Sequence, residues 1–309
     1  MKEAPMGRRR TRAFGDAVDG ILLLDKHAGV TSNHALQSVR KLLNAKKAGH
    51  TGSLDPIATG LLPICFGITT KWSGYFLGAP KHYTTTVRLG ESTETGDSEG
   101  DVLKKVEHQV TQSQIETALE SFRGVYQQVP PMYSAIKVNG QPLYKLARQG
   151  IEIDRESREV DVTYLDLIDF NGQDATLELK CSSGFYVRAL ATELGDMLGV
   201  GGHVISLRRV GVAGLDLENA VTVNHLEGLA NLQDRRGVLG DIGDALSHFP
   251  AVDLSVDAAF YICRGESVKS SKLPDKGLVR LYSPATGFLG IGVVDDHGTA
   301  SPERLVSNS

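Results

Sequence analysis

The order of apolar and polar residues predicts a chain that mixes strands and helices. Four consecutive apolar residues within 20–26 predict a buried strand, and alternating apolar residues predict strands over 83–89, 160–164 and 177–181. We expect the last two strands to be neighbours in an antiparallel sheet. Apolar residues at helical spacing predict three helices, over 35–43, 114–122 and 190–198.

The length of 309 residues favours about two domains. The mixture of strands and helices predicts an α+β domain over residues 18–248. The dipeptide at 249–250 is typical of a linker, and the glycine-punctuated apolar runs after it predict a small β-rich domain over 249–309. Ahead of both domains, residues 1–17 are predicted to form a basic disordered tail.

The charge balance excludes a strongly basic class of protein. Lys and Arg number 33 against 37 Asp and Glu, so the net charge of −4 is unlike that of a histone or a ribosomal tail. A nucleic-acid partner remains open, because local basic patches matter more than the total charge. The first twelve residues carry five basic side chains and one acidic side chain. They fit either a solubilising leader or an arm that touches RNA.

Two connections have a distinctive composition. Residues 91–101 are acidic and rich in turn-forming residues, which predicts a solvated connection. Residues 126–158 are irregular, and basic and aromatic side chains alternate there with polar ones. This composition suits a mobile arm over RNA, although a solvated excursion of the fold fits it equally well.

The cysteines, the apolar runs and the N-terminal residues indicate in which cellular compartment the protein works. Cys65, Cys181 and Cys263 lie far apart, which disfavours a disulfide framework and a structural zinc site. No run approaches about 20 apolar residues, so no membrane span is predicted. No apolar segment follows the basic N-terminus as it would in a secretory signal. We therefore expect a cytoplasmic location.

Asp55 is the first candidate for chemistry. It lies in a loop over 49–60 that contains three glycines and Pro56. A carboxylate in a loop pinned by glycine and proline can be held rigidly at the rim of a cleft, as a catalytic acid must be. The alternative is a helix N-cap, with proline at the first helical position.

Aromatic and basic residues form a second candidate set. If residues 184–188 continue as a strand, Tyr186 and Arg188 point to the same face, where they can stack a base and pair with a carboxylate. Tyr83 is a third member of this set. An ordinary half-buried tyrosine beside a surface arginine is the alternative. His50 stands alone, and no spacing typical of a metal site accompanies it.

Several familiar motifs are absent from the sequence. There is no phosphate-binding P-loop, and no dinucleotide-binding glycine pattern follows the first strand. The nucleophile elbow of α/β-hydrolases is also missing. The residues alone therefore indicate a two-domain protein with basic flanks and one unusual aspartate loop.

A series of motifs, in order along most of the chain, carries a specific resemblance. These are GILLLDK at 20–26, GHTGSLDP at 49–56, KHY at 81–83, PMYSA at 131–135, YKLARQG at 144–150, GFYVR at 184–188 and GHVISLRR at 202–209. Together they closely resemble the bacterial tRNA pseudouridine synthase B (TruB) family. The chain departs from the family at His27, where proline is usual.

The resemblance implies a fold and an activity. The implied fold is the α+β fold of the pseudouridine synthases, with a mixed, largely antiparallel sheet flanked by helices. It is followed by a C-terminal domain that resembles the small RNA-binding PUA module. The implied activity converts uridine 55 in the T-loop of tRNA to pseudouridine, with neither cofactor nor metal. Asp55 is the implied nucleophile, and attack on the sugar and attack on the base are both open.

The same resemblance implies roles around the target uridine, which must be flipped out of its stack. Tyr83 stacks on the base and is a candidate for the final proton removal, while Tyr186 and Leu207 line the pocket. His50 fills the space left in the RNA loop. Arg188 pairs with Asp55, and we expect its charge to lower the pKa of that carboxyl and keep it ionised.

For partners, the resemblance implies the T-arm and elbow of tRNA, with the arm at 126–158 closing over the T-arm. The C-terminal domain is expected to touch the acceptor side, and a monomer is expected. Two alternatives are an RNA chaperone that opens the tRNA elbow without chemistry and a guide-RNA-dependent relative of the same superfamily.

Overall fold

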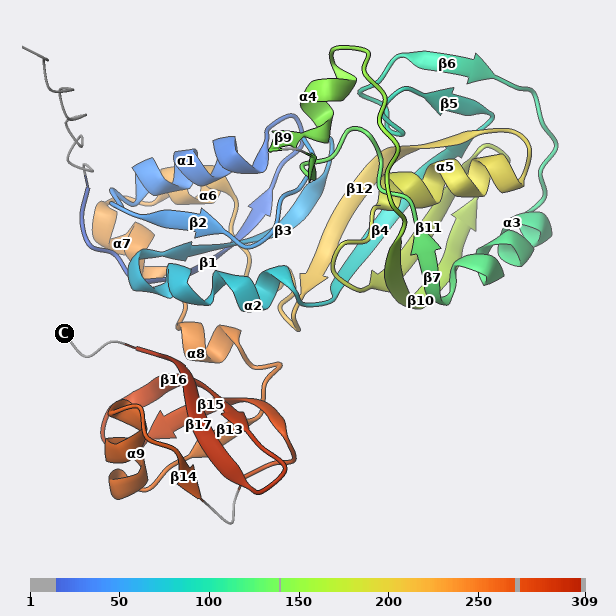
Figure 1. Ribbon diagram of the computed structural model, residues 1–309. Coiled ribbons are helices and arrows are strands. Elements are labelled where there is room, and N and C mark those ends of the chain that lie inside the picture. The colour runs from blue at the N-terminus through green and yellow to red at the C-terminus, as the bar shows by residue number, and fades with distance from the viewer. Residues whose placement is uncertain (1–14, 139, 270–272, 307–309) are drawn as a thin grey trace, which may run out of the picture.

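The computed structural model describes residues 15–138, 140–269 and 273–306. Its larger domain is built on one sheet with the strand order β1-β3-β12-β4-β11-β10-β7, and β2 pairs with β3 (Figure 1). All pairings in this sheet are antiparallel except that of β12 with β3, which confirms the predicted mixed, largely antiparallel sheet. The strands are β1 (Gly20–Lys26), β2 (Ala48–His50), β3 (Thr59–Phe66), β4 (Lys81–Leu89), β7 (Gly124–Gln128), β10 (Arg158–Phe170), β11 (Asp174–Cys181) and β12 (Gly202–Val212).

Short helices flank this sheet. Of these, α1 and α5 bury Val39 and Leu194 in the same apolar core as the sheet residue Leu22. Thr31 caps α1 by accepting a hydrogen bond from the amide of His34, as its side-chain chemistry predicts. The helices are α1 (Ser32–Leu42), η1 (Gly67–Trp72), α2 (Ser73–Leu77), α3 (Gln112–Leu119), η2 (Glu120–Phe122), α4 (Leu143–Ala147), α5 (Val187–Met197), α6 (Val223–Gly228), α7 (Leu232–Gly237) and α8 (Ile242–Ala245).

The sheet is buried on both faces near β1. Leu22 and Leu24 belong to the core beneath α1 and α5, whereas Ile21 packs into a second core with Trp72 and Ile291. A strand that is covered on both sides needs apolar residues at successive positions. This explains the run of four apolar residues in β1.

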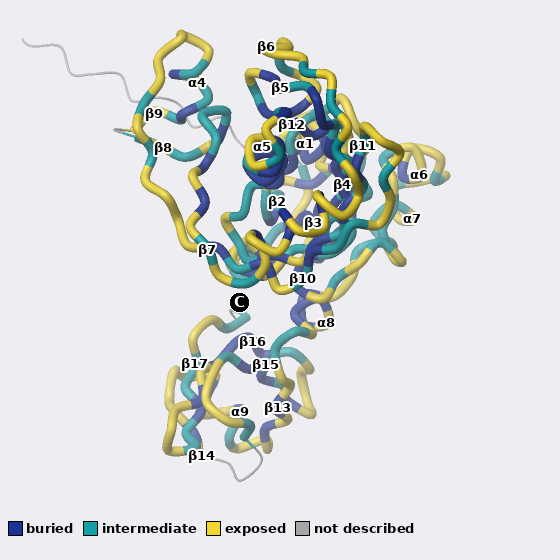
Figure 2. Tube along the Cα trace, turned by 90° about the vertical axis from the view of Figure 1, so that its right-hand side faces the viewer, coloured by how far each residue is buried: buried dark blue, intermediate teal, exposed yellow. Residues whose placement is uncertain are grey.

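Two excursions extend from the larger domain. The acidic connection forms a hairpin of β5 (Glu91–Thr93) and β6 (Val102–Lys105). The arm leaves the sheet after β7, carries β8 (Lys137–Val138), β9 (Gln141–Pro142) and α4, and returns at the start of β10. In Figure 2 the arm stands apart from the buried strands and α5.

The C-terminal part forms the predicted small β-rich domain. Its sheet has the order β13-β15-β16-β17-β14 and encloses a core of its own. The ring of Phe288 packs on Trp72 of the larger domain, and Tyr75 donates a hydrogen bond to Glu303 at 3.1 Å. Its elements are β13 (Ala251–Asp253), α9 (Val256–Cys263), β14 (Val268–Lys269), β15 (Gly277–Ser283), β16 (Gly287–Val294) and β17 (Thr299–Leu305).

The predicted tail falls mostly outside the described residues. Residues 1–14 are not described, but Asp16 already pairs with the backbone of the segment after α1 and with Arg236. The packed part of the chain therefore includes residues that the sequence assigned to the tail. No helix in the described ranges is long and apolar enough to span a membrane.

Candidate active site

A cavity of about 1120 Å³ opens between the aspartate loop, the strands β4 and β12, the start of α5 and the arm. Its wall also includes residues of the acidic connection. The structure brings together at this cavity all six residues that the sequence singled out, namely His50, Asp55, Tyr83, Tyr186, Arg188 and Leu207.

The loop that carries Asp55 is fixed from both sides. The Ser32 hydroxyl accepts a hydrogen bond from the Leu54 amide at 2.6 Å and donates one to the Leu54 carbonyl at 3.0 Å. On the other side, the Pro56 carbonyl accepts from the Gly29 amide at 2.9 Å. No helix begins at Asp55, so the N-cap alternative is excluded and the carboxylate faces the cavity.

Lys26 supports the same loop from a buried position. Its ammonium group donates to the Val30 carbonyl at 2.8 Å and reaches the Pro56 carbonyl at 3.4 Å. Burial lowers the pKa of Lys26 to about 8, against the opposing attraction of Asp55. A buried cation thus lies beside the turn that presents the carboxylate.

Arg188 lies in a helix, and the predicted strand over 184–188 is wrong. Tyr186 is the N-cap of α5, and Arg188 is in the first turn of that helix. The two side chains therefore do not share a face by strand alternation. Both nevertheless reach the cavity, because the helix begins at its rim.

The Arg188 guanidinium connects α5 to three other segments of the chain: the aspartate loop, the acidic connection and the arm. Its Nε lies 2.9 Å from Oδ2 of Asp55 and 3.5 Å from Oδ2 of Asp97. Its two terminal nitrogens donate to the carbonyls of Thr95 at 3.0 Å and Tyr133 at 2.7 Å. The expected contact with Asp55 is present, and the same side chain also ties the acidic connection and the arm to the site.

The pKa of Asp55 shifts in the opposite direction to the one expected. Burial raises the pKa of the Asp55 carboxyl, the Arg188 charge works against this shift, and the negative charge of Asp97 adds to it. The Asp55 side chain is 42% exposed, and it lines the cavity. Arg188 thus offsets only part of the cost of placing a carboxylate there.

Asp97 is a site residue that the sequence did not reveal. It was counted among the acids of a solvated connection, but it is only 2% exposed. Its Oδ1 accepts hydrogen bonds from the Thr95 hydroxyl and from the Glu99 amide. Nothing in the sequence distinguishes Asp97 from the other acidic residues of 91–101, because the whole segment has the composition of a surface turn.

Tyr83 meets a second residue that was missed, Arg209. The two are paired across β4 and β12, and Arg209 donates to the Leu61 carbonyl at 2.8 Å and the Gly52 carbonyl at 3.1 Å. Burial raises the pKa of the Tyr83 phenol, with the Arg209 charge opposing. A neutral phenol therefore faces the cavity at neutral pH.

Gly60 allows the close packing of β3 on β12. Its φ is +98°, and a β carbon built there would lie 2.2 Å from the carbonyl oxygen of Arg209. A side chain at this position would push Arg209 away from Tyr83. The last glycine of the sequence-predicted loop is thus required by packing at the site.

The other predicted residues complete the wall. The Nδ1 atom of His50 is buried without a hydrogen-bond partner in the described chain, and burial together with the Arg209 charge lowers the pKa of this imidazole. Leu207 on β12 is only 7% exposed and gives the cavity an apolar patch. Burial also raises the pKa of the Tyr186 phenol.

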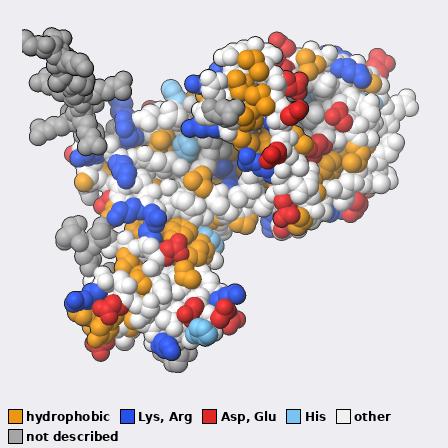
Figure 3. Space-filling view, in the orientation of Figure 1, with side chains coloured by type: hydrophobic (Ala, Val, Ile, Leu, Met, Phe, Trp, Pro, Cys, Tyr) orange, Lys and Arg blue, Asp and Glu red, His pale blue; other side chains and the backbone are white. Residues whose placement is uncertain are grey.

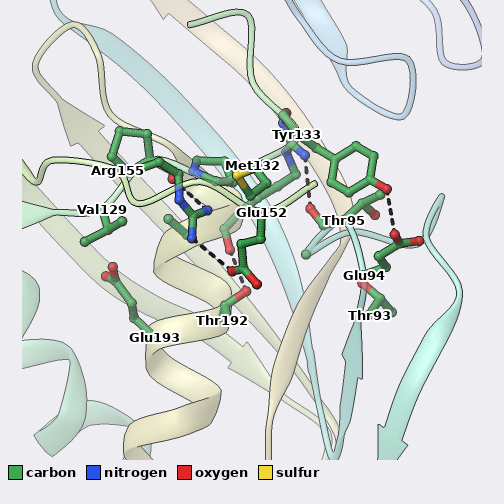
Figure 4. A pocket seen from close by; sticks show the side chains of 15 residues that line it. Thr93, Glu94, Thr95, Val129, Met132, Tyr133, Glu152, Arg155, Thr192 and Glu193 are labelled. Carbon is green, nitrogen blue, oxygen red and sulfur yellow. Dashed lines mark hydrogen bonds and ion pairs between the residues drawn. The ribbon is translucent and has the colours of Figure 1, made fainter. Parts of the chain in front are cut away.

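A second, smaller cavity of about 320 Å³ lies on the other side of Arg188. It is enclosed by the acidic connection, the two ends of the arm and α5 (Figure 4). Tyr133 borders both cavities, and its hydroxyl donates to Glu94 at 2.7 Å. The arm is thereby fastened to the acidic connection beside Arg188.

Comparison with known proteins gives consistent matches along the chain. Three family models match in succession: the TruB family pseudouridylate synthase N-terminal domain over 40–187, the tRNA pseudouridylate synthase B C-terminal domain over 188–247, and the pseudouridine synthase II TruB C-terminal domain over 250–306. The tRNA pseudouridine synthase B of Shewanella pealeana is 46% identical over 96% of this chain and 97% of its own length. That of Pseudomonas paraeruginosa is 48% identical over 94% and 96%.

Solved structures share the fold. A chain of a Cbf5-Nop10-Gar1 complex superposes with a TM-score of 0.71, covering 93% of this chain and 84% of that one at 24% identity. A chain of an H/ACA RNP bound to a substrate RNA containing 2'-deoxyuridine gives a TM-score of 0.70 at 21% identity, covering 94% and 85%.

The fold and the family matches define the chain as a pseudouridine synthase. Within this class, the chain belongs to the TruB family, which confirms the resemblance of its motifs.

Proposed function

We propose that this enzyme converts uridine 55 in the T-loop of tRNA to pseudouridine, with Asp55 as the nucleophile. The observation that carries the proposal is the Asp55 carboxylate, held 2.9 Å from Arg188 at the wall of a cavity of about 1120 Å³. A cavity of this size admits a flipped nucleoside. The relatives named tRNA pseudouridine synthase B support tRNA as the substrate.

The reaction is an isomerisation, so its atoms balance within the nucleotide. The bond from C1' of the ribose to N1 of uracil breaks, the base turns, and a bond from C1' to C5 forms. C5 loses a proton and N1 gains one. Asp55 attacks either the sugar or the base ring, and in both cases it is released when the new bond is complete.

The surrounding residues take roles that fit their environment. Arg188 orients the Asp55 carboxylate and stabilises its charged form against the effect of burial. Tyr83 stacks on the flipped base and takes part in moving the C5 proton, while Tyr186 and Leu207 exclude water that would hydrolyse an intermediate. His50, with its pKa lowered, enters the RNA loop as a neutral ring.

Local basic surface supplies the attraction for RNA, since the net charge is negative. In Figure 3, Lys and Arg side chains gather over α1 and α7 and at the junction of the two domains. The last turns of these helices carry Arg40, Lys41, Arg235 and Arg236. We assign residues 18–248 to catalysis and residues 249–309 to contact with the acceptor side of the tRNA. The arm at 126–158 closes over the T-arm. One monomer binds one tRNA, and the reaction takes place in the cytoplasm.

The test is incubation of the purified full chain with an unmodified tRNA transcript, followed by mass spectrometry and chemical mapping of pseudouridine. We expect modification at position 55 alone with no added guide RNA or protein, and none with Asp55→Asn. Modification elsewhere, or full activity of Asp55→Asn, contradicts the proposal. Assisted tRNA folding that persists in the variant without any modification would instead favour the RNA chaperone.

A further inference from the structure

Gln128 is a buried polar residue at a structural junction outside the cavity wall. It is the last residue of β7 and is only 1% exposed. Its partner in the sheet is Arg158, the first residue of β10. The arm leaves the sheet after one of these residues and returns at the other, so Gln128 marks the root of the arm.

The Gln128 amide holds the backbone of Tyr186 with two hydrogen bonds. Its Oε1 accepts from the Tyr186 amide at 2.8 Å, and its Nε2 donates to the Tyr186 carbonyl at 3.2 Å. The Nε2 group also donates to the Tyr126 hydroxyl at 3.0 Å. A primary amide supplies both a donor and an acceptor, which few other side chains can do at one position.

This contact fixes the point at which α5 begins. Tyr186 is the N-cap of α5, and its carbonyl also accepts the first helical hydrogen bond, from the Leu190 amide at 3.2 Å. The Tyr186 backbone conformation is extended, with φ −117° and ψ 111°. The Tyr186 side chain makes no capping hydrogen bond, and the Gln128 side chain binds the backbone at this helix start instead.

Two side chains of the candidate site lie at this helix start. Tyr186 lines the cavity, and Arg188 in the next turn contacts Asp55. A small rotation at the start of the helix would move the guanidinium away from its partners, and a displacement of about 1 Å in a catalytic group costs about 100-fold in rate.

We propose that Gln128 is a positioning residue for the reaction: it clamps the Tyr186 backbone to the root of the arm and thereby sets the place of Arg188 against Asp55. This role rests on the proposed function. It also links the arm to the catalytic carboxylate through the protein interior, independently of the Arg188 contact with the Tyr133 carbonyl.

The test compares Gln128→Leu with Gln173→Leu in single-turnover and steady-state assays on the tRNA transcript. Leucine at 128 keeps the bulk of the side chain but can neither donate nor accept, whereas Gln173 is an exposed glutamine between β10 and β11, outside the arm and the cavity. We expect Gln128→Leu to lower the single-turnover rate at least tenfold with tRNA affinity within threefold of wild type. Gln173→Leu should stay within twofold in both. A Gln128→Leu rate within twofold of wild type overturns the proposal.

Gln128→Glu provides a second measurement that does not depend on the leucine variant folding. A carboxylate can accept from the Tyr186 amide but cannot donate to its carbonyl, whereas the protonated acid can do both. We therefore expect the rate of Gln128→Glu, relative to wild type at the same pH, to rise severalfold from pH 8 to pH 6. A ratio that stays flat while the variant remains folded contradicts the clamp.

A third measurement separates this proposal from the proposed function. Hydrogen exchange of the peptide that contains Tyr186 and Leu190 requires no substrate. It should be faster in Gln128→Glu at pH 8 than in wild type, because the start of α5 has lost a support. Unchanged exchange contradicts the clamp. If the wild-type chain forms no pseudouridine, the proposed function fails on its own.

Discussion

Nε of Arg188 and Oδ2 of Asp55 lie 2.9 Å apart, and this contact is part of a larger arrangement around one guanidinium. Each terminal nitrogen of Arg188 donates to a backbone carbonyl, one in the acidic connection and the other in the arm. One buried side chain therefore connects the catalytic candidate to both excursions of the fold. A disturbance of either excursion is expected to reach Asp55 through Arg188.

Arg188→Lys is expected to lower the reaction rate about 100-fold, although it keeps the positive charge. A lysine ammonium cannot reach Asp55, the Thr95 carbonyl and the Tyr133 carbonyl together in the geometry of the planar guanidinium. Single-turnover pseudouridine formation measures the rate, and a filter-binding assay measures tRNA affinity. If the lysine variant keeps the wild-type rate, charge alone suffices and the multiple contacts have no catalytic role.

The pH dependence of the rate is expected to show an acid limb from protonation of Asp55, above the ordinary aspartate range because burial raises this pKa. The charge of Asp97 contributes to the increase. Asp97→Asn is therefore expected to move the limb to lower pH, whereas Asp253→Asn, at an exposed position in the C-terminal domain, should leave it in place. Single-turnover rates from pH 5 to pH 8 provide the measurement.

The direction in which Asp97→Asn moves the acid limb decides how Asp97 acts on Asp55. A limb that moves to higher pH in Asp97→Asn would show that Asp97 acts on Asp55 through structure and not through its charge. A limb that is identical in wild type and in both variants would assign the titration to another group.

The sequence correctly predicted the elements that neighbouring residues alone determine. The apolar run of β1 and the Thr31 cap of α1 appear where the pattern placed them. Strand β3 was missed, since it follows a glycine-rich loop and contains Pro63, which cannot donate a hydrogen bond within a sheet. Its place between β1 and β12 depends on tertiary packing.

The site was predictable as a set of residues but not as an arrangement. The motif resemblance singled out Asp55 and Arg188, and the structure places them in contact. The residues around Tyr186 favour an extended chain locally, whereas the distant Gln128 holds the backbone at which α5 begins. The burial of Asp97 likewise depends on Arg188, which is remote in sequence.

Lys26→Met is expected to change how stability depends on pH. Burial lowers the pKa of Lys26 from 10.5 in the unfolded chain to about 8 in the folded one. The unfolded state therefore binds more protons between these two values, so the wild type gains stability as the pH rises through this window. Relative to Lys26→Met, the gain should approach about 3 kcal/mol.

Urea unfolding of wild type and Lys26→Met at pH 7, 8.5 and 10 measures this difference, with Lys104→Met on the exposed strand β6 as the control. The control should run parallel to wild type at all three values. A constant difference between wild type and Lys26→Met would mean that the Lys26 ammonium is not penalised by its burial.

Removal of residues 250–309 is expected to weaken tRNA binding at least tenfold at physiological salt, because it removes part of the proposed RNA surface, including the basic side chains of Arg264, Lys269 and Lys276. The same truncation should also lower the melting temperature, since Trp72 is fully buried and loses its contact with Phe288. Phe288→Ala in the full chain separates the two effects: it should lower the melting temperature while tRNA affinity changes less than threefold. If the truncated chain binds tRNA as tightly as the full one, the C-terminal domain has no part in binding, and its packing on Trp72 is structural alone.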